Sequence, residues 1–205
     1  MKFIFSFIVI CTVALSGVEY EPKDYTYLIE KMPKIDKKLQ KIHFKLYQGY
    51  VANVNKLNQL LESDLDSFAF QAVKRRYGWE YDGMMLHQLY FDNLGGNGRL
   101  GKNRILYKKI VKQFGSFAKW KDDVIRTALV RGIGWVILYW DSETDELTNA
   151  WIQEHALGLL ATNTPLLVID LWEHAYLCQF GLNRKQYMDT VFSYIDWNVV
   201  SKRMQ

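Results

Sequence analysis

Cysteine and proline are scarce in this chain of 205 residues, which holds only 2 cysteines and 3 prolines. Two cysteines cannot build the disulfide framework of a small secreted domain. Few prolines and no low-complexity tract argue against an extended or disordered chain. With 49% hydrophobic and 15% aromatic residues, the chain can bury a substantial core in one or two compact domains. We expect Cys178, which follows Tyr176 and Leu177, to be a small core residue.

The chain also lacks a strong charge of either sign. Its 26 lysine and arginine residues exceed its 22 aspartate and glutamate residues by a formal net charge of only +4. No cluster of basic residues alternates with aromatic residues in the way that a nucleic-acid groove requires, so we expect no nucleic-acid partner. A mildly positive surface would still favour encounters with a small anionic substrate.

The apolar run at residues 3–13 is too short for a spanning helix, which needs roughly 20 apolar residues. It follows Lys2 and precedes the small-x-small triplet Ala14-Leu15-Ser16, a pattern typical of a secretory signal peptide. A lipidated Cys11 is disfavoured because the preceding Ile10 is bulky. We therefore predict a signal peptide at residues 1–17, a secreted or periplasmic protein, and no permanent membrane anchor.

Apolar residues recur at helical spacing over residues 35–61 and 68–94, and the second stretch stops at the glycine-rich segment 95–98. This pattern predicts two long helices that form a hairpin. We place this N-terminal helical hairpin domain at residues 18–98.

The period changes in the second half of the chain. Two aromatic and branched runs, 135–140 and 147–152, flank a polar segment and predict an antiparallel β-hairpin, and residues 166–169 supply a third strand. Further helices are expected at residues 103–114, 116–131, 172–180 and 184–194. The predicted fold is therefore α+β, with the helical hairpin followed by a mixed domain at residues 99–205 that contains a three-stranded antiparallel sheet.

Histidine is also rare, with 4 residues in the whole chain. One of them, His174, stands four residues after Asp170, behind an apolar run. A carboxylate and an imidazole at this spacing can offer an oxygen and a nitrogen ligand to one metal ion. The spacing is common, however, and by itself it also fits a hydrogen-bonded structural pair.

The four histidine segments together resemble the iron/manganese superoxide dismutase family. The resemblance runs from Tyr25 to Trp197 in the order of the family's segments. It rests on IHFKLYQGYV around His43, LHQLYFDNL around His87, WIQEH ending at His155, and DLWEHAY from Asp170 to Tyr176. Shorter matching segments are FGSF at 114–117, GIGW at 132–135 and IDW at 195–197.

The resemblance implies a superoxide dismutase, an enzyme that converts two superoxide anions into dioxygen and hydrogen peroxide by alternate reduction and oxidation of one iron or manganese ion per chain. The positions that match the family's protein ligands are His43, His87, Asp170 and His174, with a solvent molecule as the fifth ligand. Iron and manganese share these ligands. The residues do not identify the metal; we expect iron, on the resemblance to one branch of the family that is described next.

The resemblance also assigns roles around the metal. Many family members hold the bound solvent with a glutamine, and this chain resembles a branch in which a histidine, here His155, takes that place. Tyr50 matches the tyrosine of the substrate funnel, while Trp135 and Trp172 match aromatic residues that wall the metal pocket. The sequence alone does not distinguish these aromatic residues from ordinary core residues.

Glu173 matches a glutamate that pairs, across a symmetric interface, with the metal-binding histidine of a second subunit. The resemblance therefore implies a homodimer in which Glu173 contacts the partner subunit's His174. The tyrosine that many relatives carry near this interface is replaced by Leu177, and its histidine partner by Leu46 or Tyr47.

A second departure concerns His43, which stands seven residues before Tyr50 where most members have eight. One residue corresponds to about 100° of helix, so we expect a local bulge or deletion to bring His43 to the site. Both departures leave open a dismutase-like protein that binds metal in a structural or interaction role with little turnover. A different oxygen-dependent iron enzyme is disfavoured, because three histidines, one carboxylate and one solvent leave little room for a second substrate.

Overall fold

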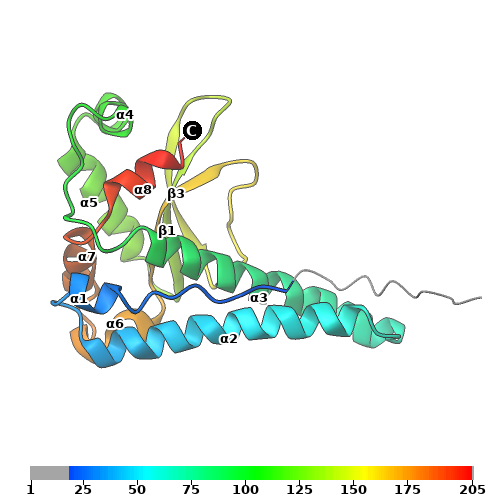
Figure 1. Cartoon of the computed structure of the whole chain (residues 1–205). Coiled ribbons are helices and arrows are strands. Elements are labelled where there is room, and N and C mark those ends of the chain that lie inside the picture. Colours follow the sequence, from blue (N-terminus) through cyan, green and yellow to red (C-terminus); the bar gives the residue numbers. More distant parts are fainter. Residues whose placement is uncertain (1–18, 205) are drawn as a thin grey trace, which may run out of the picture.

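The computed structural model describes residues 19–204, so the predicted signal peptide lies outside the described residues. Helices and strands follow one another in an order that separates a helical first half from a mixed second half (Figure 1). The elements are α1 (Leu28–Lys31), α2 (Lys37–Leu61), α3 (Ser67–Asp92), α4 (Ile105–Phe114), α5 (Phe117–Ala128), β1 (Gly134–Trp140), β2 (Leu147–Gln153), β3 (Thr164–Asp170), α6 (Glu173–Phe180), α7 (Arg184–Phe192) and α8 (Trp197–Lys202). The predicted α+β fold is confirmed. Within this part of the chain, no helix combines the length and apolar character needed to cross a membrane.

Helices α2 and α3 form the predicted hairpin and lie side by side along most of their length (Figure 1). Each begins at an aspartate cap: the Asp36 carboxylate accepts from the Leu39 N–H at 2.9 Å, and that of Asp66 from the Ala69 N–H at 2.8 Å. These caps satisfy backbone donors that a helix start would otherwise leave unpaired. They explain why both helices begin within two residues of the predicted positions.

The sheet has the strand order β2-β1-β3, with β1 antiparallel to both neighbours. All residues of β1 except the last are buried, which matches its continuous apolar sequence. The register places Trp135 opposite Ile152 on one side and opposite Asp170 on the other. Since α3 packs against β3, this end of the sheet faces the helical hairpin, and the candidate site lies there.

The glycine-rich segment after α3 is held against the C-terminal part of the chain. The Gly96 N–H donates to the Tyr194 carbonyl at 2.8 Å, and the Gly98 N–H to that of Ile195 at 3.1 Å. A Cβ atom at Gly96 would lie 2.5 Å from the Ile195 carbonyl oxygen. Close backbone contact therefore explains the glycine. A domain boundary between residues 98 and 99 remains a prediction.

Three features differ from expectation. Helices α1 and α8, of four and six residues, were not predicted, because such short helices show too little periodicity. Cys178 is exposed, so the prediction that it lies in the core was wrong. Its position on α6 explains this, because Cys178 is two residues, or about 200°, beyond the buried Tyr176.

Arg203, near the C-terminus, connects the helical first half of the chain to the sheet by hydrogen bonds. Its guanidinium donates to the carbonyls of Leu166 at 2.7 Å and Leu89 at 2.8 Å, and to the Asn93 side-chain oxygen at 3.3 Å. Burial lowers the pKa of Arg203 to about 10, so the guanidinium is still charged at neutral pH. This contact joins the end of α3 to the start of β3.

We expect Arg203→Met to lower the free energy of unfolding by about 2–4 kcal/mol, because it leaves partly buried carbonyls without their charged donor. Urea unfolding followed by circular dichroism measures the change. Lys202→Met is the matched control, since Lys202 is an exposed neighbour and is expected to change stability by less than about 0.5 kcal/mol. Equal urea midpoints for Arg203→Met and Lys202→Met would contradict this role of Arg203.

Candidate metal centre

Four potential metal ligands from both halves of the chain meet at one point. His43 comes from α2, His87 from α3, Asp170 from the end of β3 and His174 from α6, and their ligand atoms all lie within 4.8 Å of one another. Asp170 Oδ2 lies at the centre, 3.0 Å from Nε2 of His43, 3.6 Å from that of His87 and 3.2 Å from that of His174. The first three residues are buried, and the His174 side chain is 22% exposed.

A regular helix brings His43 to this point. Helix α2 is α-helical from Lys37 to Leu61 without interruption. Seven residues turn the helix by about 700°, which is only about 20° short of two full turns, so His43 and Tyr50 share one face. The expected bulge or deletion was therefore wrong. The seven-residue spacing is what an unbroken helix requires.

The donor atoms fit a metal ion. His87 Nδ1 donates to the Gly83 carbonyl at 2.6 Å, which leaves the lone pair of its Nε2 directed toward the group. This Nε2 is buried and makes no hydrogen bond with any described residue. Asp170 Oδ1 accepts from the Trp172 N–H at 2.7 Å, which directs Oδ2 toward the imidazoles. Three imidazoles and one carboxylate suit a first-row transition metal.

The protonation states also suit a metal. Burial lowers the pKa of His87 well below its usual value, and it lowers the pKa of His43 although Asp170 opposes the effect. Burial alone would raise the pKa of Asp170, but His174 and His43 together hold it well below its usual range. Around pH 7, His43 and His87 are therefore neutral and Asp170 is ionised, which are the ligating forms.

His155 lies beside this group in an aromatic box and is fully buried. Trp135 Nε1 donates to His155 Nδ1 at 3.1 Å, and His155 Nε2 lies 2.8 Å from the Tyr50 hydroxyl. The Trp172 ring stacks on the imidazole with a centroid distance of 4.7 Å. The structure thus brings Tyr50, Trp135 and Trp172 together around His155. Their functional roles remain predictions.

The hydrogen bonds assign the tautomer of His155. An indole N–H can only donate, so Nδ1 is the acceptor and the proton of the neutral imidazole is on Nε2. Burial lowers the pKa of His155 to about 4, so the ring is neutral at pH 7. His155 Nε2 therefore donates to the Tyr50 oxygen. The hydroxyl proton of Tyr50, whose pKa is raised by burial, is left free for another acceptor.

Gly83 is a site residue that was not predicted from the sequence. A Cβ atom there would lie 2.6 Å from Cε1 of Tyr50. The missing side chain lets the Tyr50 ring lie against His87 with a centroid distance of 5.0 Å. The signal in the sequence is a glycine inside a long helix, one turn before His87, where alanine would be favoured by about 1 kcal/mol.

We expect Gly83→Ala to displace Tyr50 and to destabilise the protein by about 1–3 kcal/mol, as overpacking does in a dense core. Gly78→Ala is the matched control on the same helix, because a Cβ at Gly78 meets nothing within 4 Å. It should stabilise α3 by up to about 1 kcal/mol. Thermal unfolding of both variants tests the prediction, and a gain in stability for both would contradict the contact between Gly83 and Tyr50.

Glu173 stands apart from the group. It is exposed at the start of α6, and its carboxylate makes no hydrogen bond or ion pair with the side chains or backbone of residues 19–204. Two other residues near His155, Trp79 and Glu154, were not predicted as site residues. The Trp79 ring lies edge-on to the imidazole at a centroid distance of 4.6 Å.

Comparison with known proteins shows the family to which this chain belongs. Residues 102–203 match the family described as iron/manganese superoxide dismutases, C-terminal domain. The chain is 31% identical over 202 residues to the superoxide dismutase [Mn/Fe] of Aeropyrum pernix, which covers 94% of this chain and 93% of the relative. The chain belongs to the iron/manganese superoxide dismutase family.

Other relatives carry either metal in their names. The superoxide dismutase [Fe] of Pyrobaculum aerophilum is 32% identical over 182 residues, which cover 84% of this chain and 85% of the relative. The superoxide dismutase [Mn] 1 of Haloferax volcanii is 27% identical over 194 residues, which cover 93% of this chain and 96% of the relative. Membership of the dismutase family therefore predicts the class of metal and leaves iron and manganese as alternatives.

Proposed function

We propose that this protein is a superoxide dismutase, which converts two superoxide anions and two protons into dioxygen and hydrogen peroxide. The observation that carries the proposal is the group of three histidines and one aspartate, in a chain of this family. A redox-active iron or manganese ion, held by His43, His87, Asp170 and His174, supplies the one-electron chemistry when it is bound.

The residues beside the ligands hold and deliver protons. His155 Nε2–H donates to the Tyr50 oxygen, and Tyr50 can then direct its own hydroxyl proton toward the substrate side of the site. Trp135 fixes His155 through Nδ1. Because Trp135 can only donate, His155 cannot take the opposite tautomer without losing this bond. The arrangement keeps a proton donor ready beside an anionic substrate.

The aromatic residues restrict the site to small molecules. Trp135 is fully buried, and its ring lies 5.0 Å from that of His87. Trp172 stacks on both His155 and His174, at centroid distances of 4.7 and 5.9 Å. Such walls exclude bulk water and strengthen the electrostatic interactions of the few polar groups inside.

We propose iron as the physiological metal, on the resemblance to the branch with a histidine at position 155. The test is to load the protein without residues 1–17 separately with iron and with manganese, and to measure metal content and superoxide dismutation. Activity with about one iron per chain supports the proposal, and activity with manganese alone contradicts the choice of metal. Full occupancy by either metal without turnover would favour the metal-binding alternative.

We propose a homodimer in which Glu173 contacts the partner subunit's His174. Exposure of Glu173, partial exposure of His174 and the exposed Leu177 on the same helix support this arrangement. Sedimentation equilibrium of the protein and of Glu173→Ala tests it. The proposal expects a dimer that Glu173→Ala weakens, and a monomeric wild-type protein would contradict it.

We further propose export by the signal peptide, so that the mature protein begins near residue 18 and is secreted or periplasmic. N-terminal sequencing of the protein purified from its own cells tests this. A mature chain that still begins at Met1 would contradict it.

A further inference from the structure

His155 stands in a tight turn whose base is well fixed. Gln153 and Leu157 close the turn with two backbone hydrogen bonds, of 2.9 and 3.2 Å, and the Glu154 N–H donates to the Ile133 carbonyl at 3.1 Å. All of these bonds lie within the C-terminal half of the chain. These bonds fix the turn relative to the sheet. They do not fix it relative to helix α3, which carries His87, so other contacts must do so.

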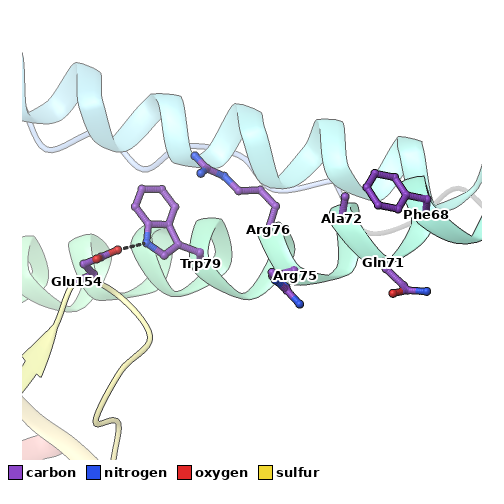
Figure 2. A pocket seen from close by; sticks show the side chains of 7 residues that line it. All are labelled: Phe68, Gln71, Ala72, Arg75, Arg76, Trp79 and Glu154. Carbon is purple, nitrogen blue, oxygen red and sulfur yellow. Dashed lines mark hydrogen bonds between the residues drawn. The ribbon is translucent and has the colours of Figure 1, made fainter.

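Glu154 provides such a contact. Its carboxylate accepts from Trp79 Nε1 at 3.1 Å, a bond that joins the turn directly to α3 (Figure 2). Glu154 has a positive φ of 52°, a left-handed conformation that costs a non-glycine residue roughly 1–2 kcal/mol. Strain of this kind persists when the surroundings demand it, and it is concentrated at functional sites.

Arg76 makes a further contact with Trp79. The guanidinium of Arg76 lies 4.3 Å from the centre of the indole ring and pairs with the buried carboxylate of Glu80. Trp79 and Glu154 also line a surface pocket of about 620 Å³, and Figure 2 shows both at its end nearest the sheet. Trp79 and Glu154 therefore lie between the His155 imidazole and solvent, on the outer side of the aromatic residues around His155.

We propose that Trp79 and Glu154 form a latch that positions His155 for proton delivery, an inference that rests on the proposed dismutase function. The latch fixes the distance between the turn of His155 and the helix of His87. When the Trp79–Glu154 bond is broken, the turn is no longer joined to α3, and the imidazole is no longer held in the orientation that donates to Tyr50. Trp79 and Glu154 are positioning residues and need not touch the substrate.

Three substitutions separate the parts of the latch. Trp79→Phe keeps an aromatic ring against His155 but removes the N–H donor. Glu154→Gly removes the acceptor and also relieves the left-handed strain. Glu154→Gln keeps an oxygen acceptor in the same place and serves as the conservative control.

The first measurement needs no turnover. In protein loaded with diamagnetic zinc and labelled with ¹⁵N-histidine, the wild type and Glu154→Gln should show His155 as a single Nε2–H tautomer. Trp79→Phe and Glu154→Gly should show exchange broadening or a shift toward the other tautomer. Unchanged His155 resonances in both variants would overturn the latch, whether or not the protein proves to be a dismutase.

The second measurement uses the iron- or manganese-loaded enzyme. Trp79→Phe and Glu154→Gly should each lower kcat by about fivefold, part of the loss typical for a misplaced proton donor, while kcat/KM stays within about twofold. The double variant should be no worse than either single one, because both break the same bond. Glu154→Gly should also be at least as heat-stable as the wild type. A fall in kcat/KM with kcat unchanged would overturn the latch in favour of a role in substrate entry.

Discussion

Replacing His174 by alanine is expected to remove the metal from the purified protein and to abolish measurable dismutation. The substitution deletes one of the four proposed ligands and leaves Asp170 Oδ2 without its contact at 3.2 Å. Because outer-sphere changes alone typically weaken metal binding by 10–100-fold, loss of a direct ligand should weaken it by more than about 100-fold. Metal content after gel filtration, measured by mass spectrometry, and superoxide dismutation check both parts.

His174 is the best of the three histidines for this test. It is the least buried, with a side chain that is 22% exposed, whereas His43 and His87 are almost completely buried. Its removal opens no closed cavity, but it takes one of its imidazole partners from the buried Asp170 carboxylate, so the metal-free variant should fold and unfold at a lower temperature than the metal-free wild type. A variant that keeps one metal per chain would exclude His174 as an essential ligand. A variant that fails to fold would show up in the thermal scan.

The architecture of this protein could be predicted largely from local sequence patterns. The long helices α2 and α3 show strong helical periodicity, and the buried strand β1 is an uninterrupted apolar run, so each was expected within one or two residues of its observed bounds. Helices α1 and α8 were missed because four and six residues do not define a period. Cys178 was misplaced because its apolar neighbours precede it along the chain, whereas burial on α6 depends on angle around the helix.

The site could be predicted only in part. Its four proposed ligands, which the structure brings together, were named from the resemblance, since no local pattern brings His43 and Asp170 together across 127 residues. The seven-residue spacing between His43 and Tyr50 was judged against relatives with eight residues, although an unbroken helix favours seven. Gly83, Trp79 and Glu154 were missed because their importance lies in contacts with distant residues: Gly83 makes room for Tyr50, and Trp79 and Glu154 meet across 75 residues.

His155→Ala is expected to keep the metal and to lose most of the turnover. His155 is 20 residues from Trp135 and 105 from Tyr50 in sequence, and it connects the two by hydrogen bonds without belonging to the ligand group. Alanine would leave the Trp135 N–H without its acceptor and Tyr50 without the donor that orients it. Since a positioned proton donor contributes 10²–10⁴-fold to a rate, we expect kcat to fall by about 100-fold.

The matched control is His155→Gln, because a glutamine can reproduce both hydrogen bonds. Its amide oxygen can accept from Trp135 Nε1, and its amide nitrogen can donate to Tyr50, in the same sense as the neutral Nε2–H imidazole. His155→Gln should therefore retain much more activity than His155→Ala at equal metal content. Equal activity of His155→Ala and the wild type would remove His155 from the reaction. Loss of the metal in His155→Ala would instead mean that His155 helps to hold the metal ligands in place. Equal losses of activity in His155→Ala and His155→Gln would mean that the reaction uses the imidazole itself, which can carry a proton on either nitrogen.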